Sequence, residues 1–213
     1  MKFVTSTFVT LALASVALGH GALVAVQGEN GVTGKGIGIV DSTPRDGTRR
    51  DPFQADTSII RDREITAGTA GVCGRTLAGG NNANPELTQV RAMIDGGQMP
   101  TMFKDGTVKM TLHQINGDGG GPYTCQMSVD MGATFTDMEV VTNIPGENSR
   151  SRAKATDFPL VARATTLPDG PAMVRCRNAA RAGPFGGCVM VAPPAAAAPA
   201  KRSLNASVEE DEY

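Results

Sequence analysis

Apolar and polar residues alternate in short runs along the chain, and segments rich in glycine and proline separate these runs. A period of two places successive side chains on opposite faces of a β-strand, so each run predicts a half-buried strand. The clearest runs are 108–113, with Val108, Met110 and Leu112 on one face, and 125–130. Further strands are expected at 22–26, 37–40, 138–142, 160–164, 172–177 and 188–192. Short strands separated by turn residues are typical of an all-β sandwich.

One segment has the spacing of a short helix. Asn84 and Pro85 suit a helix N-cap and first turn, and Gly96 suits the C-terminal end. Apolar residues between them recur at helical spacing. The stretch 41–64 mixes charges with prolines and a glycine, so we expect an elaborated loop region there.

The N-terminal 19 residues have the pattern of a secretory signal peptide. Lys2 is followed by a mostly apolar segment, 3–18, and Ala17 and Gly19 are the small residues that precede a cleavage site. A membrane-spanning helix needs about 20 apolar residues, and this segment is shorter and interrupted by threonines. The sequence therefore predicts a secreted protein whose mature chain begins at His20. Residues 20–192 are expected to form one sandwich domain.

Residues 193–213 differ in composition from the rest of the chain. An alanine- and proline-rich segment is followed by an acidic one, and neither has enough apolar side chains to fold alone. Lys201 and Arg202 form a dibasic pair at which a secretory protease can cut, although such pairs also occur by chance. Asn205 begins a sequon for N-glycosylation. This tail is expected to be disordered and to carry no lipid anchor.

The formal net charge of the chain is −1. So balanced a charge argues against a general electrostatic grip on nucleic acid or on an anionic membrane. The protein is expected to be a secreted monomer. The absence of tryptophan, with Tyr123 as the only tyrosine before the tail, also disfavours tight binding to crystalline cellulose or chitin, because flat sugar-binding surfaces rely on aromatic faces.

Four cysteines lie in the predicted mature chain. An even number in the oxidising secretory route favours two disulfides, and four cysteines allow three pairings, among which the sequence does not choose. Zinc is the alternative, but no two cysteines have the spacing of two to four residues that structural zinc sites use. The expected disulfide cysteines are Cys73, Cys125, Cys176 and Cys188.

Only two histidines occur in the chain, His20 and His113. Cleavage before His20 would give one residue with a free α-amine and an imidazole, a chelating pair that the precursor lacks. The alternation around His113 places it opposite the apolar face, where it can supply a third nitrogen. Three nitrogens favour one copper ion over zinc, because copper(II) binds nitrogen most strongly in the first-row series and accepts planar arrangements. The alternative is that both histidines are solvated residues without a ligand role.

Several motifs occur together in one order. They are the run HG at 20–21, GVCGRT at 71–76, HQIN at 113–116, GGGPYTC at 119–125 and GPFGGC at 183–188. On these motifs, the chain resembles the Egh16-like virulence factors of fungi, which include appressorium-specific proteins of plant- and insect-infecting species. The resemblance covers nearly all of 20–192. It implies production in infection structures and a contribution to penetration of the host surface.

A second resemblance is to lytic polysaccharide monooxygenases. His20 and His113 match the two histidines that hold copper in those enzymes, and the Gly-Pro-Tyr-Thr-Cys run is similar to one in fungal members. This resemblance implies an immunoglobulin-like β-sandwich and copper-dependent oxidation of a polysaccharide.

Three more residues enter through this second resemblance. Phe185 is the candidate for an aromatic ring near an axial copper position, with a core phenylalanine behind a turn as the alternative. Gln114 is a candidate for hydrogen bonding around the metal, which requires a bulge or strand end, because on a regular strand it points away from His113. Tyr123 is either an axial or surface aromatic or packs beside Cys125.

Two functions therefore stay open at this point. One is a non-catalytic secreted virulence factor in which copper is structural, scavenged or absent. The other is a copper-dependent oxidative enzyme that acts on a host or fungal wall polysaccharide. A serine hydrolase is disfavoured because no G-x-S-x-G elbow occurs. A glycoside hydrolase would need paired carboxylates, for which Asp105, Asp118, Asp130, Asp137 and Glu139 are available, but surface acids are the simpler explanation.

Overall fold

The computed structural model describes residues 20–46, 55–82 and 92–194. The expected signal peptide, the tail with Asn205, and the expected helix start at Asn84 all lie outside these residues.

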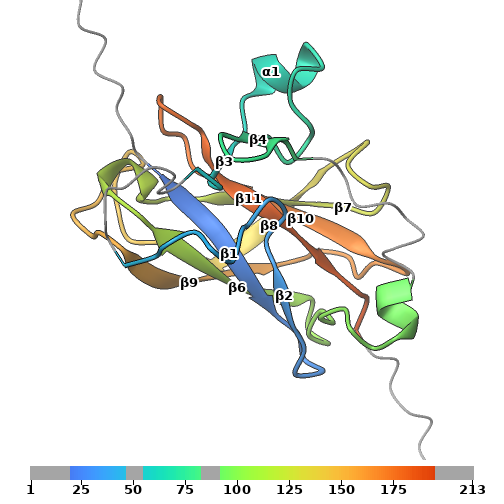
Figure 1. The fold of residues 1–213 in the computed structure, drawn as a ribbon. Coiled ribbons are helices and arrows are strands. Elements are labelled where there is room, and N and C mark those ends of the chain that lie inside the picture. Colours follow the sequence, from blue (N-terminus) through green and yellow to red (C-terminus); the bar gives the residue numbers. More distant parts are fainter. Residues whose placement is uncertain (1–19, 47–54, 83–91, 195–213) are drawn as a thin grey trace, which may run out of the picture.

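The described residues form a two-layer β-sandwich in which neighbouring strands pair antiparallel (Figure 1). The first layer runs, in spatial order, β2 (Thr33–Lys35), β1 (Gly21–Gln27), β6 (Thr107–Gln114), β9 (Thr156–Arg163) and β8 (Thr136–Thr142). The second layer continues from β8 through β7 (Thr124–Ser128), β10 (Ala172–Arg177), β11 (Phe185–Val191), β3 (Ser58–Ile59), β4 (Arg75–Thr76) and β5 (Gly80–Asn81). The all-β, disulfide-stabilised fold expected from the sequence is confirmed.

Strand β8 belongs to both layers. Its first part pairs with β7, as in Cys125 opposite Met138, and its second part pairs with β9, as in Glu139 opposite Arg163. On the other side of the sandwich, the backbone N–H of Ile37 donates to the carbonyl of Cys188 at 2.8 Å. The two layers are therefore joined at both sides.

The main core lies between the layers. Leu23, Leu112 and Leu160 point inward from the first layer, and Val174 and Val189 from the second, and all five are fully buried or nearly so. Burying a side chain of this size stabilises the fold by about 1.5–3 kcal/mol. The alternation of β6 matches this arrangement, because Leu112 faces the core while Lys109 is exposed.

Most expected strands are confirmed, and one is wrong. Strands β1, β6, β7, β8, β9, β10 and β11 cover the other predicted runs. Residues 37–40 form a turn instead, with Gly38 at φ +85° and the N–H of Ile39 bonded to the carbonyl of Gly36. A left-handed residue in the middle of the run is incompatible with an extended strand.

The expected loop at 41–64 contains two short elements that periodicity could not reveal, β3 and the start of helix α1 (Asp62–Thr66). The expected helix end at Gly96 agrees with the structure, because residues 92–95 are helical and Gly97 has φ +63°. The N–H of Gly97 bonds to the carbonyl of Ile94, and that of Gln98 to Met93. These two bonds form a Schellman motif.

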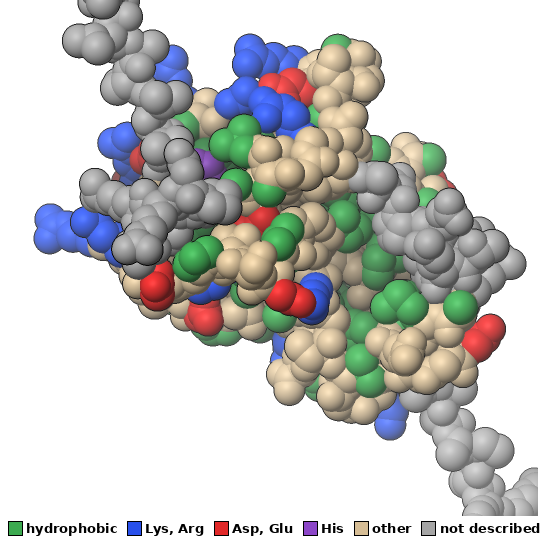
Figure 2. Space-filling model, in the orientation of Figure 1, with side chains coloured by type: hydrophobic (Ala, Val, Ile, Leu, Met, Phe, Trp, Pro, Cys, Tyr) green, Lys and Arg blue, Asp and Glu red, His purple; other side chains and the backbone are tan. Residues whose placement is uncertain are grey.

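Basic side chains gather around carboxylates at and beside helix α1 (Figure 2). Arg75 and Arg61 both contact Glu64, and the hydrogen bond from Arg75 is the main cause that lowers the pKa of this carboxyl. Arg61 also donates to the carbonyls of Gly183 and Ala182 at 2.9 and 2.8 Å. The helix therefore fixes the turn that leads into β11.

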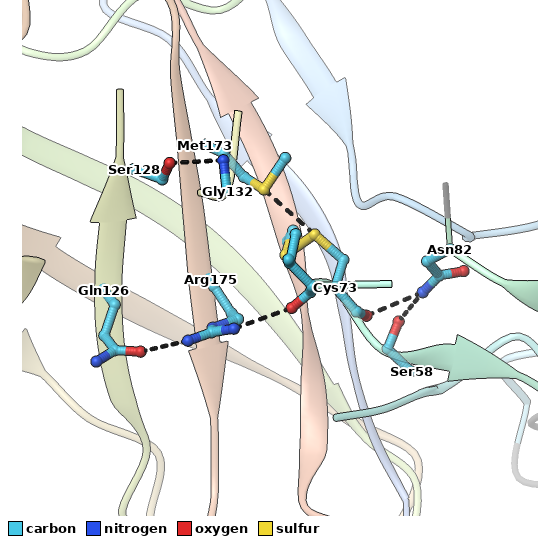
Figure 3. The surroundings of a disulfide bond; sticks show 10 residues. Ser58, Cys73, Asn82, Gln126, Ser128, Gly132, Met173 and Arg175 are labelled. Atoms are coloured by element: carbon cyan, nitrogen blue, oxygen red, sulfur yellow. Dashed lines mark hydrogen bonds between the residues drawn. A yellow bond between two sulfur atoms is a disulfide. The ribbon is translucent and has the colours of Figure 1, made fainter. Parts of the chain in front are cut away.

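Two disulfides are present. Cys125 and Cys176 lie directly opposite each other on β7 and β10. Cys73 bonds to Cys188 on β11, and its carbonyl accepts a hydrogen bond from Asn82 (Figure 3). Cross-linking residues 115 positions apart stabilises by about 4–5 kcal/mol in the chain-entropy model. This bridge ties the small strands β3 to β5 to the sandwich.

No helix within the described residues is long and apolar enough to cross a membrane.

Candidate metal centre

The register of β1 and β6 brings the two histidines together. Ala22 lies opposite His113, and the carbonyl of His20 accepts a hydrogen bond from the N–H of Ile115 at 2.9 Å. His20 is therefore the diagonal neighbour of His113 on one face of the strand pair. Diagonal neighbours lie about 7–8 Å apart in the backbone, within reach of long or ring side chains. Leu23 and Leu112 occupy the opposite face, in the core.

His113 is oriented by a carboxylate. Its Nδ1 lies 2.6 Å from Oδ1 of Asp157, the residue opposite it on β9. A carboxylate accepts the Nδ1 hydrogen, which leaves the Nε2 lone pair as an acceptor. Nε2 is buried and has no hydrogen-bond partner among the described residues. A buried acceptor without a partner costs about 1–3 kcal/mol, so this nitrogen suits a metal ion as its missing partner.

Phe185 contacts the other histidine. Its ring centroid lies 4.8 Å from that of His20, with 33° between the two planes. Phe185 is the first residue of β11, and it also packs with Ile59 and Ala180 in a small buried cluster. The ring is therefore a core residue that also lies against His20, and its place near an axial copper position stays a prediction.

The backbone nitrogen of His20 donates to Oδ1 of Asn116 at 2.9 Å. In the full-length chain it is a peptide nitrogen, and cleavage before His20 would turn it into the α-amine. The residues available to a metal are thus two imidazoles and, after cleavage, one amine. The described residues contain no group of three or more His, Cys, Asp or Glu side chains that could hold a metal ion by itself.

Gln114 does not lie beside His113. Although it ends β6, it still pairs with Thr156 in unbroken register, so its side chain points to the opposite face. Its Nε2 is buried and donates to the carbonyl of Asn116, at 3.0 Å, and to Oγ of Ser151, at 2.7 Å. Gln114 therefore affects His20 indirectly. It hydrogen-bonds the backbone of Asn116, whose side chain accepts a hydrogen bond from the backbone nitrogen of His20.

A tight turn lies behind the first residues of the domain. The 3-10 helix η1 (Gly117–Gly119) approaches so closely that a Cβ on Gly119 would lie 2.1 Å from the carbonyl oxygen of His20. A Cβ on Gly21 would lie 2.2 Å from Oη of Tyr123. Tyr123 belongs to the same core cluster as Cys125, and its hydroxyl donates to the carbonyl of Gly119. It is therefore a core residue and not a surface aromatic, and burial raises the pKa of its hydroxyl.

Sequence reasoning missed three residues that position the histidines, Asp157, Asn116 and Gly119. Asn116 belongs to the HQIN run, and Gly119 to the glycine-rich run after it, so motif continuity was a usable signal for both. Asp157 gave no such signal, because only the pairing of β6 with β9 brings it to His113.

Three similarities to known proteins cover most of the chain. A family model described as Egh16-like virulence factor matches residues 18–186. The appressoria-specific virulence factor GAS1 of Pyricularia oryzae is 42% identical over 219 residues, which cover 95% of this chain and 84% of GAS1. GAS2 of the same species, also an appressoria-specific virulence factor, is 30% identical and is covered over 88% of its length. No solved structure is significantly similar to the chain.

The close approach of Gly21 to Tyr123 predicts a strong coupling between these residues. Gly21→Ala should destabilise the protein by about 1–3 kcal/mol because its methyl group would clash with Oη of Tyr123. In a Tyr123→Phe background most of this cost should vanish, because the next atom, the carbonyl oxygen of Gly119, lies at 3.0 Å. Urea unfolding of the wild type, of the two single variants and of the double variant measures the coupling free energy. Gly170→Ala, with open space around its added Cβ, is the control. If the destabilisation of the double variant equals the sum of the two single destabilisations to within about 0.5 kcal/mol, the prediction is contradicted.

Proposed function

The chain belongs to the Egh16-like virulence factor family, and from this membership and the paired histidines we propose that it is a secreted virulence factor of an infection structure whose mature form binds one copper ion. The virulence role rests on the relatives, which are named as appressoria-specific virulence factors and align with most of the chain. Secretion rests on the signal-peptide pattern of residues 1–19. In this role the protein contributes to penetration of the host surface.

The observation that carries the metal proposal is the placement of His20 and His113 on one face of β1 and β6. Two features support it. Nε2 of His113 is a buried acceptor without a hydrogen bond among the described residues, and the backbone nitrogen next to the His20 imidazole would become an amine on cleavage. Nitrogen ligands of this kind suit copper(II) best among first-row divalent ions. A bound copper ion would supply one-electron redox chemistry.

The surrounding residues would fix the two ligands. Asp157 selects the tautomer of His113 in which Nε2 is free to bind. Asn116 accepts a hydrogen bond from the His20 nitrogen, and Gln114 in turn holds the backbone of Asn116. The ring of Phe185 covers the His20 imidazole on one side and limits the access of water there.

Oxidation of a wall polysaccharide is the second candidate function. The observation in its favour is the Phe185 ring against His20, the neighbour expected from the resemblance to lytic polysaccharide monooxygenases. None of the large hydrophobic residues exposed in the described part of the chain is aromatic, which disfavours a flat aromatic surface for crystalline polymers. A soluble or polar polysaccharide is therefore the better substrate for this function.

Copper affinity should depend on the exposed amine of His20. Calorimetry with copper(II) should give a Kd at least about tenfold lower for protein that begins at His20 than for protein that retains Gly19, because only the first can form the amine and imidazole chelate. The His20-initiated His113→Ala variant, checked for folding by thermal unfolding, should also bind more weakly. N-terminal sequencing of the protein from its natural source tests the cleavage itself. Equal affinities for the two N-termini would refute the proposed centre.

Asp157 should act as a positioning residue for His113. Asp157→Asn should weaken copper binding by about 10–100-fold, the usual effect of losing a carboxylate behind a histidine ligand. It should also change the electron paramagnetic resonance spectrum of the copper-loaded protein, which a purely structural role would not. Asp169→Asn, an exposed aspartate in the loop after β9, is the matched control. An unchanged spectrum and affinity would remove Asp157 from the site.

Turnover would separate the two candidate functions. Copper-loaded mature protein with a reductant and oxygen or peroxide should release oxidised oligosaccharides from a soluble wall polymer, detected by mass spectrometry, if the second function holds. The His113→Ala variant is the control. If copper-loaded protein releases no oxidised products from soluble glucans, pectin or chitin oligomers, the oxidative function is contradicted and the non-catalytic role is the one that stands.

A further inference from the structure

A hollow of about 500 Å³ opens between the end of β7, the start of β8 and the loop 164–170. It lies at the opposite end of the sandwich from the histidines, because Asp157 near the start of β9 lies opposite His113, whereas β9 ends at Arg163, next to this loop. The volume is within the range of about 300–1,000 Å³ that is usual for small-molecule sites.

The floor of this hollow is part of the core. Met127 and Met138 belong to the main buried cluster, and Ala164 packs against it. At the rim, Val129 and Leu167 are 62% and 47% exposed. Covering such apolar surface gains about 25 cal/mol for each Å² removed from water, and contiguous exposed apolar residues around a hollow mark binding sites more often than single ones do.

Hydrogen-bonded turns hold both walls in place. On one side, the N–H of Ala164 donates to the carbonyl of Gly106 at 2.9 Å, in a turn that Gly106 makes at φ +80°. On the other, the carboxylate of Asp130 accepts from the backbone and side chain of Thr134 and from Ser128. These bonds hold the pKa of Asp130 well below its usual range, the side chain of Thr134 contributing most. Hydrogen bonds therefore fix the backbone turns that flank the hollow on both sides.

The polar part of the lining is acidic and hydroxylated. It contains Asp137, Asp169 and three threonines, and no lysine or arginine. Carboxylates repel an anionic head group, such as that of a fatty acid, and accept a hydrogen bond from a hydroxyl group. We propose that this hollow binds an aliphatic alcohol, with its chain on the methionine floor and its hydroxyl group donating to the aspartates at the rim.

Methyl NMR of methionine-labelled protein tests the proposal on the metal-free mature chain, so that the result is independent of copper. On titration with 1-octanol, the methyl signals of Met127 and Met138 should shift, whereas those of the fully buried Met102 and Met173 should not. Sodium octanoate, with the same chain length and an anionic head, should bind at least about tenfold more weakly. Absence of shifts with octanol, or equal binding of octanoate, would overturn the proposal.

Variants at exposed positions keep the test free of folding effects. Leu167→Asp should weaken octanol binding about tenfold or more, and Leu77→Asp, at another exposed leucine that does not line the hollow, should leave it unchanged. Asp137→Asn combined with Asp169→Asn should reduce the difference in affinity between octanol and octanoate. Sedimentation that shows a dimer broken by Leu167→Asp, together with no octanol binding, would assign the hollow to a second copy of the chain instead.

Discussion

The register between β1 and β6 is the constraint on which the rest of the candidate site depends. A shift of one residue would reverse the face of every side chain on β1, so His20 would enter the core and Leu23 would leave it. The core prevents this shift, because Leu23 and Leu112 are paired and fully buried. The hydrophobic interior thus decides where the histidines meet. Their proximity on the outer face is a by-product of apolar packing on the inner one.

Strand assignment from the sequence succeeded where alternation was long and failed where it was short. β6 follows its predicted range closely because its apolar residues share one face, and β10 follows its range although nearly all of its residues are buried. The strands β3, β4 and β5 have two residues each, too few for any period to appear. The predicted strand at 37–40 failed for a different reason, because the left-handed Gly38 turns the chain there. Apolar composition alone does not report the sign of a φ angle.

In the candidate site, too, some residues could be identified from the sequence and others could not. His20 and His113 were identifiable because histidine is rare in this chain and one copy lies at a predicted cleavage site. Asp157 was not, since its role comes from the pairing of two strands 44 residues apart. Gln114 could face the metal only if a bulge or strand end turned it there, and the unbroken register of β6 with β9 leaves it on the core-side face that its position in the alternation indicated. Local periodicity was the more reliable guide for that residue.

Strand β8, shared by both layers, has a consequence for behaviour in solution. Because it continues one layer into the other, the edges that remain at either end of the described strand order are β2, of three residues, and β5, of two. Unpaired strand edges are templates on which other chains add, and short edges make poor templates. Lys35 at the end of β2 adds a charge that opposes such pairing. The architecture therefore resists edge-to-edge aggregation, and this property would keep copies of the chain apart where they reach a high concentration.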